Sequence, residues 1–229
     1  DAPAGAWQIN FFMQRFGHWK PAYTEDYYTD LVDPKCVSEF IRTTHEEYYR
    51  RFGEEFGKAV AGIFTDEPGF YANMWQIDDA TNTWTDDFLA EFERIKGYDL
   101  RPLLLSLWED IGDFRRARAD YYDVLSIMFR DRYFRELMDW CVEHDIESIG
   151  HVTVEEELKY HVRLFCDFFR SMECLTIPGV DEITQMRSDP NVITAKLGSS
   201  SSHVIGRERT MSETFGVYLW QLSLREMKW

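Results

Sequence analysis

The stretch VAGIFTDEP, residues 60–68, decides the predicted fold. An apolar run that stops abruptly at two carboxylates and a proline is typical of a buried parallel strand whose carboxyl end opens into a site. Asp66 and Glu67 lie at the edge of an apolar core, where a charge costs free energy unless partners compensate. They are therefore candidate acids, bases or metal ligands. A strand that ends in a solvated turn is the alternative for this stretch taken alone.

Two later apolar segments end in carboxylates in the same way. LTIPGVDEI, residues 175–183, contains Asp181 and Glu182, and RTMSETFG, residues 209–216, contains Glu213. In a barrel of parallel strands the carboxyl ends of all strands meet at one rim, where active sites lie. The repetition favours a shared site over three unrelated turns.

The composition limits the ligands that such a site can bind. The 229 residues include 25 Lys and Arg against 41 Asp and Glu, for a formal charge of -16. This excess of negative charge argues against nucleic acid or an anionic membrane as a partner. An acidic protein with 16% aromatic residues is also typical of carbohydrate binding, in which rings stack on sugar faces. Trp220, shortly after the last predicted strand, is a candidate stacking residue, with a place in the core as the alternative.

The four cysteines, Cys36, Cys141, Cys166 and Cys174, are far apart and have no metal-binding spacing. We expect free thiols in a reducing compartment, and therefore a cytoplasmic protein. The sequence shows no signal peptide and no apolar run long enough to span a bilayer. Because the chain begins with Asp1 rather than Met, the presence of an upstream leader or domain is left as an open alternative.

The segment 146–152 is a further predicted strand and brings His151 to the same rim. His151 is expected to hydrogen-bond a sugar hydroxyl or to ligate a metal, with an ordinary core histidine as the alternative. Glu155 lies between this strand and the next helix, so it is the main rival of Glu67 for an acid role. Asp66 and Glu155 are also candidate substrate-binding residues.

Strands and helices alternate along the chain. Residues 7–13 are a predicted first strand, and segments with helical periodicity or helix start signals cover residues 34–53, 86–97, 114–144, 156–172 and 190–203. This alternation fits a (β/α)8 barrel or an open doubly wound sheet. No Gly-rich phosphate loop follows a strand, so we expect no nucleotide or other organic cofactor. We predict an α/β protein of the (β/α)8 TIM-barrel type, with residues 1–229 forming part of one catalytic domain.

The predicted barrel is incomplete. The capping box at residues 223–226 starts a helix that the sequence abandons almost at once. The chain supplies about five strands of the eight that a barrel needs. Because missing strands leave sheet edges exposed, we expect the chain alone to be poorly active and the rest of its own parent chain to be a partner.

Several motifs, in this order, carry a resemblance to a known family: FGKAVAGIFTDEP, FLAEFERIKGYDLRPLL, YYDVLS, GHVTVEEE, IPGVDEI, RTMSETFG and LSLREMKW. Together they resemble the catalytic barrel of bacterial glycoside hydrolases related to family 106, the α-L-rhamnosidases. The resemblance implies calcium-assisted, inverting hydrolysis of a terminal sugar. It implies that Glu67 is the general acid and Glu213 the general base. It further implies that Glu182 lies near the bound Ca²⁺, with Asp66 and Asp181 as helpers.

Three hypotheses about function follow. The first is a glycoside hydrolase that uses Glu67 and Glu213 as its two carboxylates. The second is a non-catalytic carbohydrate-binding relative, in which one of these glutamates is sealed in an ion pair. The third is a metal-dependent lyase or isomerase, in which Asp66, His151, Glu182 and Glu213 converge on one metal. Asp181 and Glu182 could also hold a hard cation through oxygen ligands, with an ion pair to an arginine as the structural alternative.

Overall fold

The computed structural model describes residues 3–14, 28–71, 81–182, 192–216 and 223–227. Its sheet has four parallel strands whose order follows the chain. The strands are β1 (Gly62–Thr65), β2 (Glu147–Gly150), β3 (Ile177–Glu182) and β4 (Met211–Thr214). The register places Thr65 beside Gly150, and Asp181 beside Glu213. All four strand ends that carry the candidate residues therefore lie at one edge.

The prediction of a (β/α)8 barrel is wrong. The described residues form an open four-stranded sheet, with β1 and β4 at its two edges. Residues 7–13, the predicted first strand, are extended but pair with no described strand, and the Phe11 side chain is 89% exposed. An alternation of strand and helix predicts parallel pairing, but it does not determine how many strands join or whether the sheet closes.

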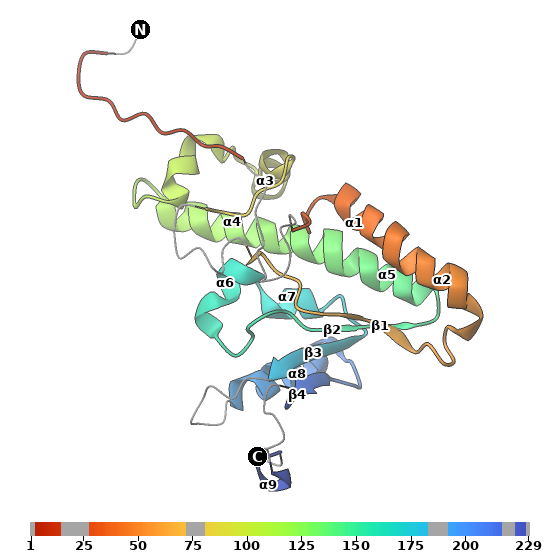
Figure 1. Ribbon diagram of the computed structural model, residues 1–229. Coiled ribbons are helices and arrows are strands. Elements are labelled where there is room, and N and C mark those ends of the chain that lie inside the picture. The colour runs from red at the N-terminus through yellow and green to blue at the C-terminus, as the bar shows by residue number, and fades with distance from the viewer. Residues whose placement is uncertain (1–2, 15–27, 72–80, 183–191, 217–222, 228–229) are drawn as a thin grey trace.

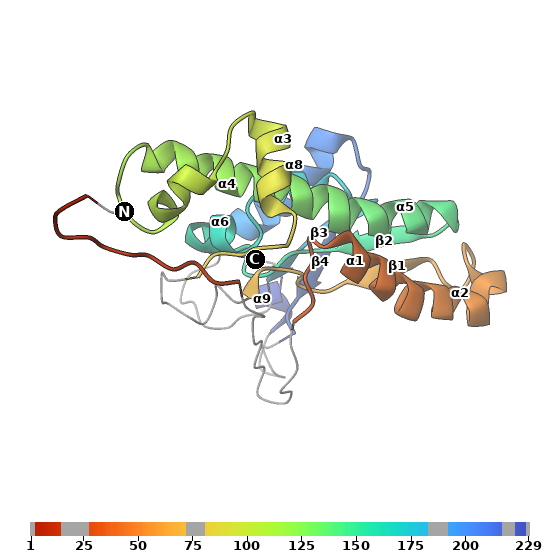
Figure 2. The same cartoon turned by 90° about the horizontal axis from the view of Figure 1, so that it is seen from above.

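Helices occupy most of the remaining described chain. The α-helices are α1 (Pro34–Phe40), α2 (Glu46–Phe52), α3 (Phe88–Lys96), α4 (Phe114–Phe129), α5 (Arg135–Glu143), α6 (His161–Leu164), α7 (Phe168–Met172), α8 (Val192–Ile205) and α9 (Leu224–Met227). The π-helical turns η1 (Ile41–His45) and η5 (Arg130–Phe134) join α1 to α2 and α4 to α5. The 3-10 turns are η2 (Gly53–Glu55), η4 (Arg101–Leu107) and η6 (Leu158–Tyr160). Figure 1 shows α4 and α5 as one long rod beside the sheet, and Figure 2 shows α1 alongside that rod.

The local signals for helix ends are confirmed at several of these helices. The side chain of Asp33 accepts a hydrogen bond from the Lys35 backbone N–H and caps α1, whose first residue is Pro34. Gly97 has a φ of 74° after α3, the left-handed conformation that glycine adopts readily at a helix end. Asp30 makes a similar local turn just before α1, by accepting from the Val32 N–H at 2.9 Å.

The predicted continuous helix at residues 156–172 is wrong. The chain instead forms η6, α6 and α7, which are separate short segments. Cys166 has a φ of 67°, which ends α6, and Asp167 adopts an extended backbone from which its side chain caps α7. A strong N-cap inside an apolar periodic stretch therefore starts a new helix and does not let the previous one continue.

The main hydrophobic core joins α3 and the long rod to α7 and to Val180 of the sheet. Its largest fully buried side chains include Phe88, Phe92, Phe129, Phe134 and Tyr121. Burial of one such aromatic side chain contributes about 1.5–3 kcal/mol, so this cluster is a major source of stability. A smaller cluster joins Phe56, Trp140, Cys141 and Ile146, with Ile63 of β1 packed on it.

The packing shows which face of the sheet the helices cover. Ile63 packs against residues of α5, and Val180 of β3 lies against Gly198 of α8, where a Cβ would come within 3.1 Å of the Val180 side chain. Side chains alternate between faces along a strand. Phe64 and Asp181 therefore point to the opposite face, which the described helices leave open, and Phe64 is 46% exposed.

The four cysteines are free thiols, as predicted. No helix in the described part of the chain is both long and apolar enough to cross a membrane.

His45 is a buried histidine with an unsatisfied ring. It is 2% exposed, neither ring nitrogen has a hydrogen-bond partner among the described residues, and its ring meets Phe40 and Trp140 edge-on. Burial lowers the pKa of His45 from 6.5 to about 4, against a smaller opposing effect of Glu46. The folded state therefore binds this proton less readily than the unfolded state does, and stability is lost as pH falls from 6.5 towards 4.

We expect His45→Phe to stabilise the fold. Removing two unsatisfied buried nitrogens should raise the free energy of unfolding by about 1–3 kcal/mol at pH 7. The gain should grow between pH 6.5 and pH 4, because the variant has no imidazole to protonate. Urea unfolding of both proteins across this pH range measures the difference. A variant that is less stable than the parent at every pH would show that the histidine has a partner or a packing role that phenylalanine lacks.

Candidate functional site

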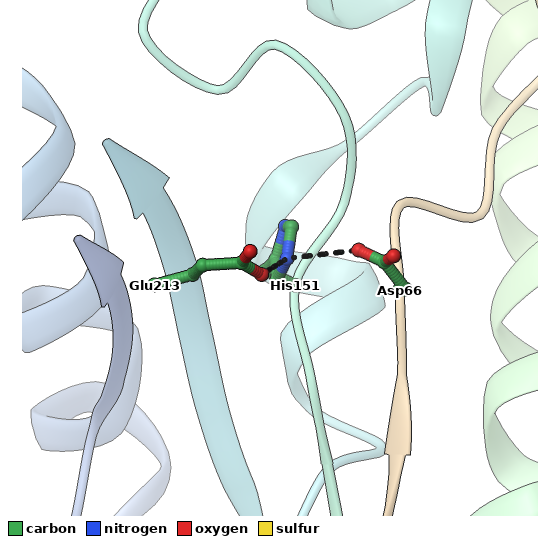
Figure 3. A group of neighbouring side chains, drawn as sticks. All are labelled: Asp66, His151 and Glu213. Carbon is green, nitrogen blue, oxygen red and sulfur yellow. Dashed lines mark hydrogen bonds and ion pairs between the residues drawn. The ribbon is translucent and has the colours of Figure 1, made fainter. Parts of the chain in front are cut away.

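Three side chains from different strands meet at the carboxyl edge of the sheet. Asp66 follows β1, His151 follows β2 and Glu213 is on β4. His151 Nε2 lies 3.4 Å from Asp66 Oδ1 and 3.2 Å from Glu213 Oε2. Figure 3 shows the two carboxylates on either side of the imidazole. The three residues therefore converge as predicted, because parallel pairing places the carboxyl ends of their strands at the same edge of the sheet.

The imidazole is held from behind by buried groups. His151 and Glu155 are both 0% exposed, and Glu155 Oε1 lies 3.3 Å from His151 Nδ1. The same carboxylate oxygen accepts the Val152 backbone N–H at 3.1 Å, and His151 Nδ1 lies 2.7 Å from the Val152 carbonyl oxygen. Glu155 is thus placed beneath His151 and away from solvent, so it reaches a ligand at the rim only through that ring.

Burial and charge act in opposite directions on this pair. Burial opposes the charge on His151, but the hydrogen bond and charge of Glu155 outweigh it and raise the His151 pKa to about 9. Burial also raises the pKa of Glu155, against the opposing pull of His151. With this raised pKa the ring is positively charged at neutral pH, and its charge offsets the negative charges of the three carboxylates around it, Asp66, Glu155 and Glu213.

Two rim residues adopt a backbone conformation that is rare outside glycine. Glu67 has a φ of 45° and Val154 a φ of 57°. For the β-branched Val154 this conformation is unusual, and such strain concentrates at functional sites. The residue after this turn is Glu155, whose carboxylate lies under His151.

A second group at the rim joins Glu67 and Asp181. Burial raises the pKa of Asp181 to about 8, and the neighbouring Glu67 adds to this effect against the attraction of the nearby His151. Tyr71 donates from its hydroxyl to the backbone carbonyl of Glu67 and lies 3.4 Å from Glu67 Oε2, and Thr153 Oγ1 lies 3.5 Å from the same oxygen.

Most of the candidate residues that the sequence suggested lie together at this edge. They are Asp66, Glu67, His151, Glu155, Asp181 and Glu213. Glu182 follows Asp181 on β3, and successive residues of a strand point to opposite faces. Glu182 therefore faces away from the others. Trp220 lies outside the described residues.

Asp181 and Glu182, the expected calcium ligands, do not converge in the structure. Calcium needs six to eight oxygen ligands, and these two side chains lie on opposite faces of the sheet. Among the described residues, the ones that could hold a metal ion are Asp66, His151 and Glu213, whose ligand atoms lie within 4.8 Å of one another. These are three of the four residues that the metal-dependent alternative named.

Two residues of the site were missed from sequence. Tyr71 and Thr153 both approach the Glu67 carboxylate, but neither has a distinctive local pattern. Thr153 follows His151 by two positions. On an extended chain this spacing puts both side chains on the same side, and it is the one sequence signal that could have placed Thr153 at the site. The contact of Tyr71 depends on the path of the loop after Pro68, for which the sequence offers no signal.

The fold is similar to that of a rhamnosidase from Novosphingobium sp. PP1Y, with a TM-score of 0.64 and 19% sequence identity. The similarity covers 86% of this chain and 18% of that enzyme, so this chain corresponds to about a fifth of its length. Neither the known family models nor the curated proteins contain a match to the sequence. At this identity the similarity shows a distant rhamnosidase-like fold and assigns no catalytic residue.

Proposed function

We propose that this chain carries the catalytic site of a glycoside hydrolase that removes a terminal sugar, with α-L-rhamnose as the sugar to test first. The observation that carries the proposal is the convergence of Glu67, Asp181 and Glu213 at one rim, where burial raises the pKa of Asp181 to about 8. Glycoside hydrolysis needs one protonated carboxyl group and one carboxylate. The rhamnosidase-like fold supports the same class of reaction.

The two kinds of carboxyl group differ in their surroundings. Asp181 is 7% exposed and lies close to Glu67, which is only partly buried. In this proposal Glu67 donates the proton to the leaving oxygen, and Asp181, whose pKa is raised, supplies the proton to Glu67. Glu213 has a side chain that is 43% exposed, and the imidazole of His151 at 3.2 Å keeps it in place. It activates the attacking water in an inverting reaction.

Aryl and alkyl glycosides of several sugars test the proposal. Release of the aglycone by the chain would support hydrolysis, and the first anomer seen by NMR would establish the stereochemical course. Because the chain alone is expected to be poorly active, the non-catalytic alternative would be favoured by binding of the sugar without any turnover in the parent protein as well.

The role of Glu67 makes a specific prediction. Glu67→Gln removes the proton donor, so it should slow alkyl glycosides, whose leaving groups need protonation, by about 10²–10⁴-fold. Glycosides of dinitrophenol leave without a proton and should be slowed far less. Rates measured on matched pairs of these substrates separate the two effects. An equal loss on both kinds of substrate would show that Glu67 has no acid role.

A further inference from the structure

The Asp66, His151 and Glu213 cluster has the spacing of a metal site. In a tetrahedral site with metal bonds of about 2.0–2.1 Å, two ligand atoms lie about 3.3 Å apart. The distances from His151 Nε2 to Glu213 and to Asp66 are 3.2 and 3.4 Å. Charge-assisted hydrogen bonds between such groups are shorter, at about 2.7–2.9 Å. The separations therefore match two edges of a coordination tetrahedron and are long for charge-assisted hydrogen bonds.

The other ring nitrogen is arranged as in metal-bound histidines. His151 Nδ1 donates to the Val152 carbonyl oxygen at 2.7 Å and lies 3.3 Å from the buried Glu155 carboxylate. Metal-ligating histidines almost always donate this second N–H to a carbonyl or a carboxylate, which fixes the tautomer. A ring that gives up its Nε2 proton to an incoming ion and keeps the proton on Nδ1 presents the lone pair of Nε2 to the space between the two carboxylates (Figure 3).

A buried oxygen nearby also lacks a partner. Asp181 is 7% exposed, and its Oδ1 has no hydrogen-bond donor among the described residues. Asp181 sits beside Glu213 in the strand register, so both side chains leave the same face of the sheet. A bound ion, or water on that ion, would satisfy this oxygen.

The outer side of the cluster is open. The side chains of Asp66 and Glu213 are 70% and 43% exposed, whereas His151 is fully buried. Three protein ligands with a remaining position for water are typical of catalytic metal sites. An ion here would hold that water next to Glu213.

We propose that Asp66, His151 and Glu213 bind one divalent transition-metal ion of the zinc class. An imidazole suits zinc and its neighbours in the first row, whereas calcium takes an all-oxygen cage. The proposed ion is of a different class from the Ca²⁺ that the resemblance implied, and of the residues that the resemblance placed near the metal only Asp66 is among its ligands. The proposal concerns the site of the proposed hydrolysis but is tested by binding alone, so the two can fail separately.

Calorimetric titration of untagged, chelator-treated protein with Zn²⁺ tests the site. We expect one ion per chain with micromolar or tighter affinity, weakened at least about tenfold in Asp66→Asn and in Glu213→Gln. Both replaced side chains are exposed enough for the fold to persist. Glu157→Gln is the matched control, because Glu157 lies past Glu155 and pairs with Lys159 at 3.9 Å. It should bind as the parent does.

A spectroscopic measurement supplies an independent readout. X-ray absorption of the Zn²⁺ complex should show one imidazole and otherwise oxygen neighbours, and the imidazole signal should disappear in His151→Gln. Three results would overturn the proposal: no Zn²⁺ binding, binding that is unchanged in both carboxylate variants, or Ca²⁺ displacing Zn²⁺ at equal concentration.

Discussion

Glu213→Gln is expected to lower kcat/KM for glycoside hydrolysis by about 10²–10⁴-fold, the usual contribution of a general base. The amide keeps the size of the side chain and can still approach His151, but it can neither accept a proton from water nor carry charge. Because the Glu213 side chain is 43% exposed and belongs to an edge strand, its replacement should leave the fold intact. Steady-state kinetics on a substrate that the parent cleaves measures the effect.

The control for this variant is Glu208→Gln. Glu208 is exposed and lies just before the amino end of β4, so the change removes the same charge from the opposite end of the same strand. It should keep the kcat/KM of the parent. If Glu213→Gln loses less than about tenfold, below the usual range for a general base, Glu213 does not activate the water. If both variants lose activity equally, the effect comes from net charge and not from the site.

Glu155→Ala is expected to lower the free energy of unfolding by about 3–5 kcal/mol, the usual cost of breaking a buried ion pair from one side. His151 and Glu155 are both fully buried, so no water replaces the missing carboxylate. The Val152 N–H would lose its acceptor as well. Urea unfolding at pH 7 measures the change.

Two further variants separate charge from hydrogen bonding. Glu155→Gln keeps an oxygen that can accept the Val152 N–H but has no charge for His151, so it should destabilise less than the alanine variant does. Glu157→Ala removes a partly exposed glutamate whose ion pair has a 3.9 Å separation, and it should cost no more than about 1 kcal/mol. A loss of less than about 1 kcal/mol in Glu155→Ala would mean that the pair is far weaker than a buried ion pair.

Local patterns in the sequence predicted most of the described helices and the four paired strands, but not the unpaired state of residues 7–13 or the division of residues 156–172 into short segments. The apolar periodicity of residues 114–144 appears as the α4 to α5 rod, and Gly97 ends α3 as expected. Such signals work because capping groups and the helical repeat act within a few residues of each other. The break at Cys166 and Asp167 was not predicted, because the apolar pattern continues through it.

The candidate site was predicted in part. Asp66, His151 and Glu213 each follow or end an apolar segment, and parallel pairing is enough to bring such residues to one edge. The burial of Glu155 under His151 depends on the left-handed turn at Val154, which its residue type disfavours. The pairing of Glu67 with Asp181 joins β1 to β3, which are not adjacent in the sheet, and no local pattern records it.

The sequence by itself determined that this is an α/β chain with acidic side chains and a histidine at the ends of parallel strands. Period-two and period-3.6 patterns are local, and they decide both the element and the face on which each side chain lies. Only the tertiary structure decided that the described strands form an open sheet, that Glu67 lies close to Asp181, and that Glu155 supports His151 from beneath. These features depend on contacts between residues far apart in the chain, whose free energies come from packing and burial and not from local conformational preference.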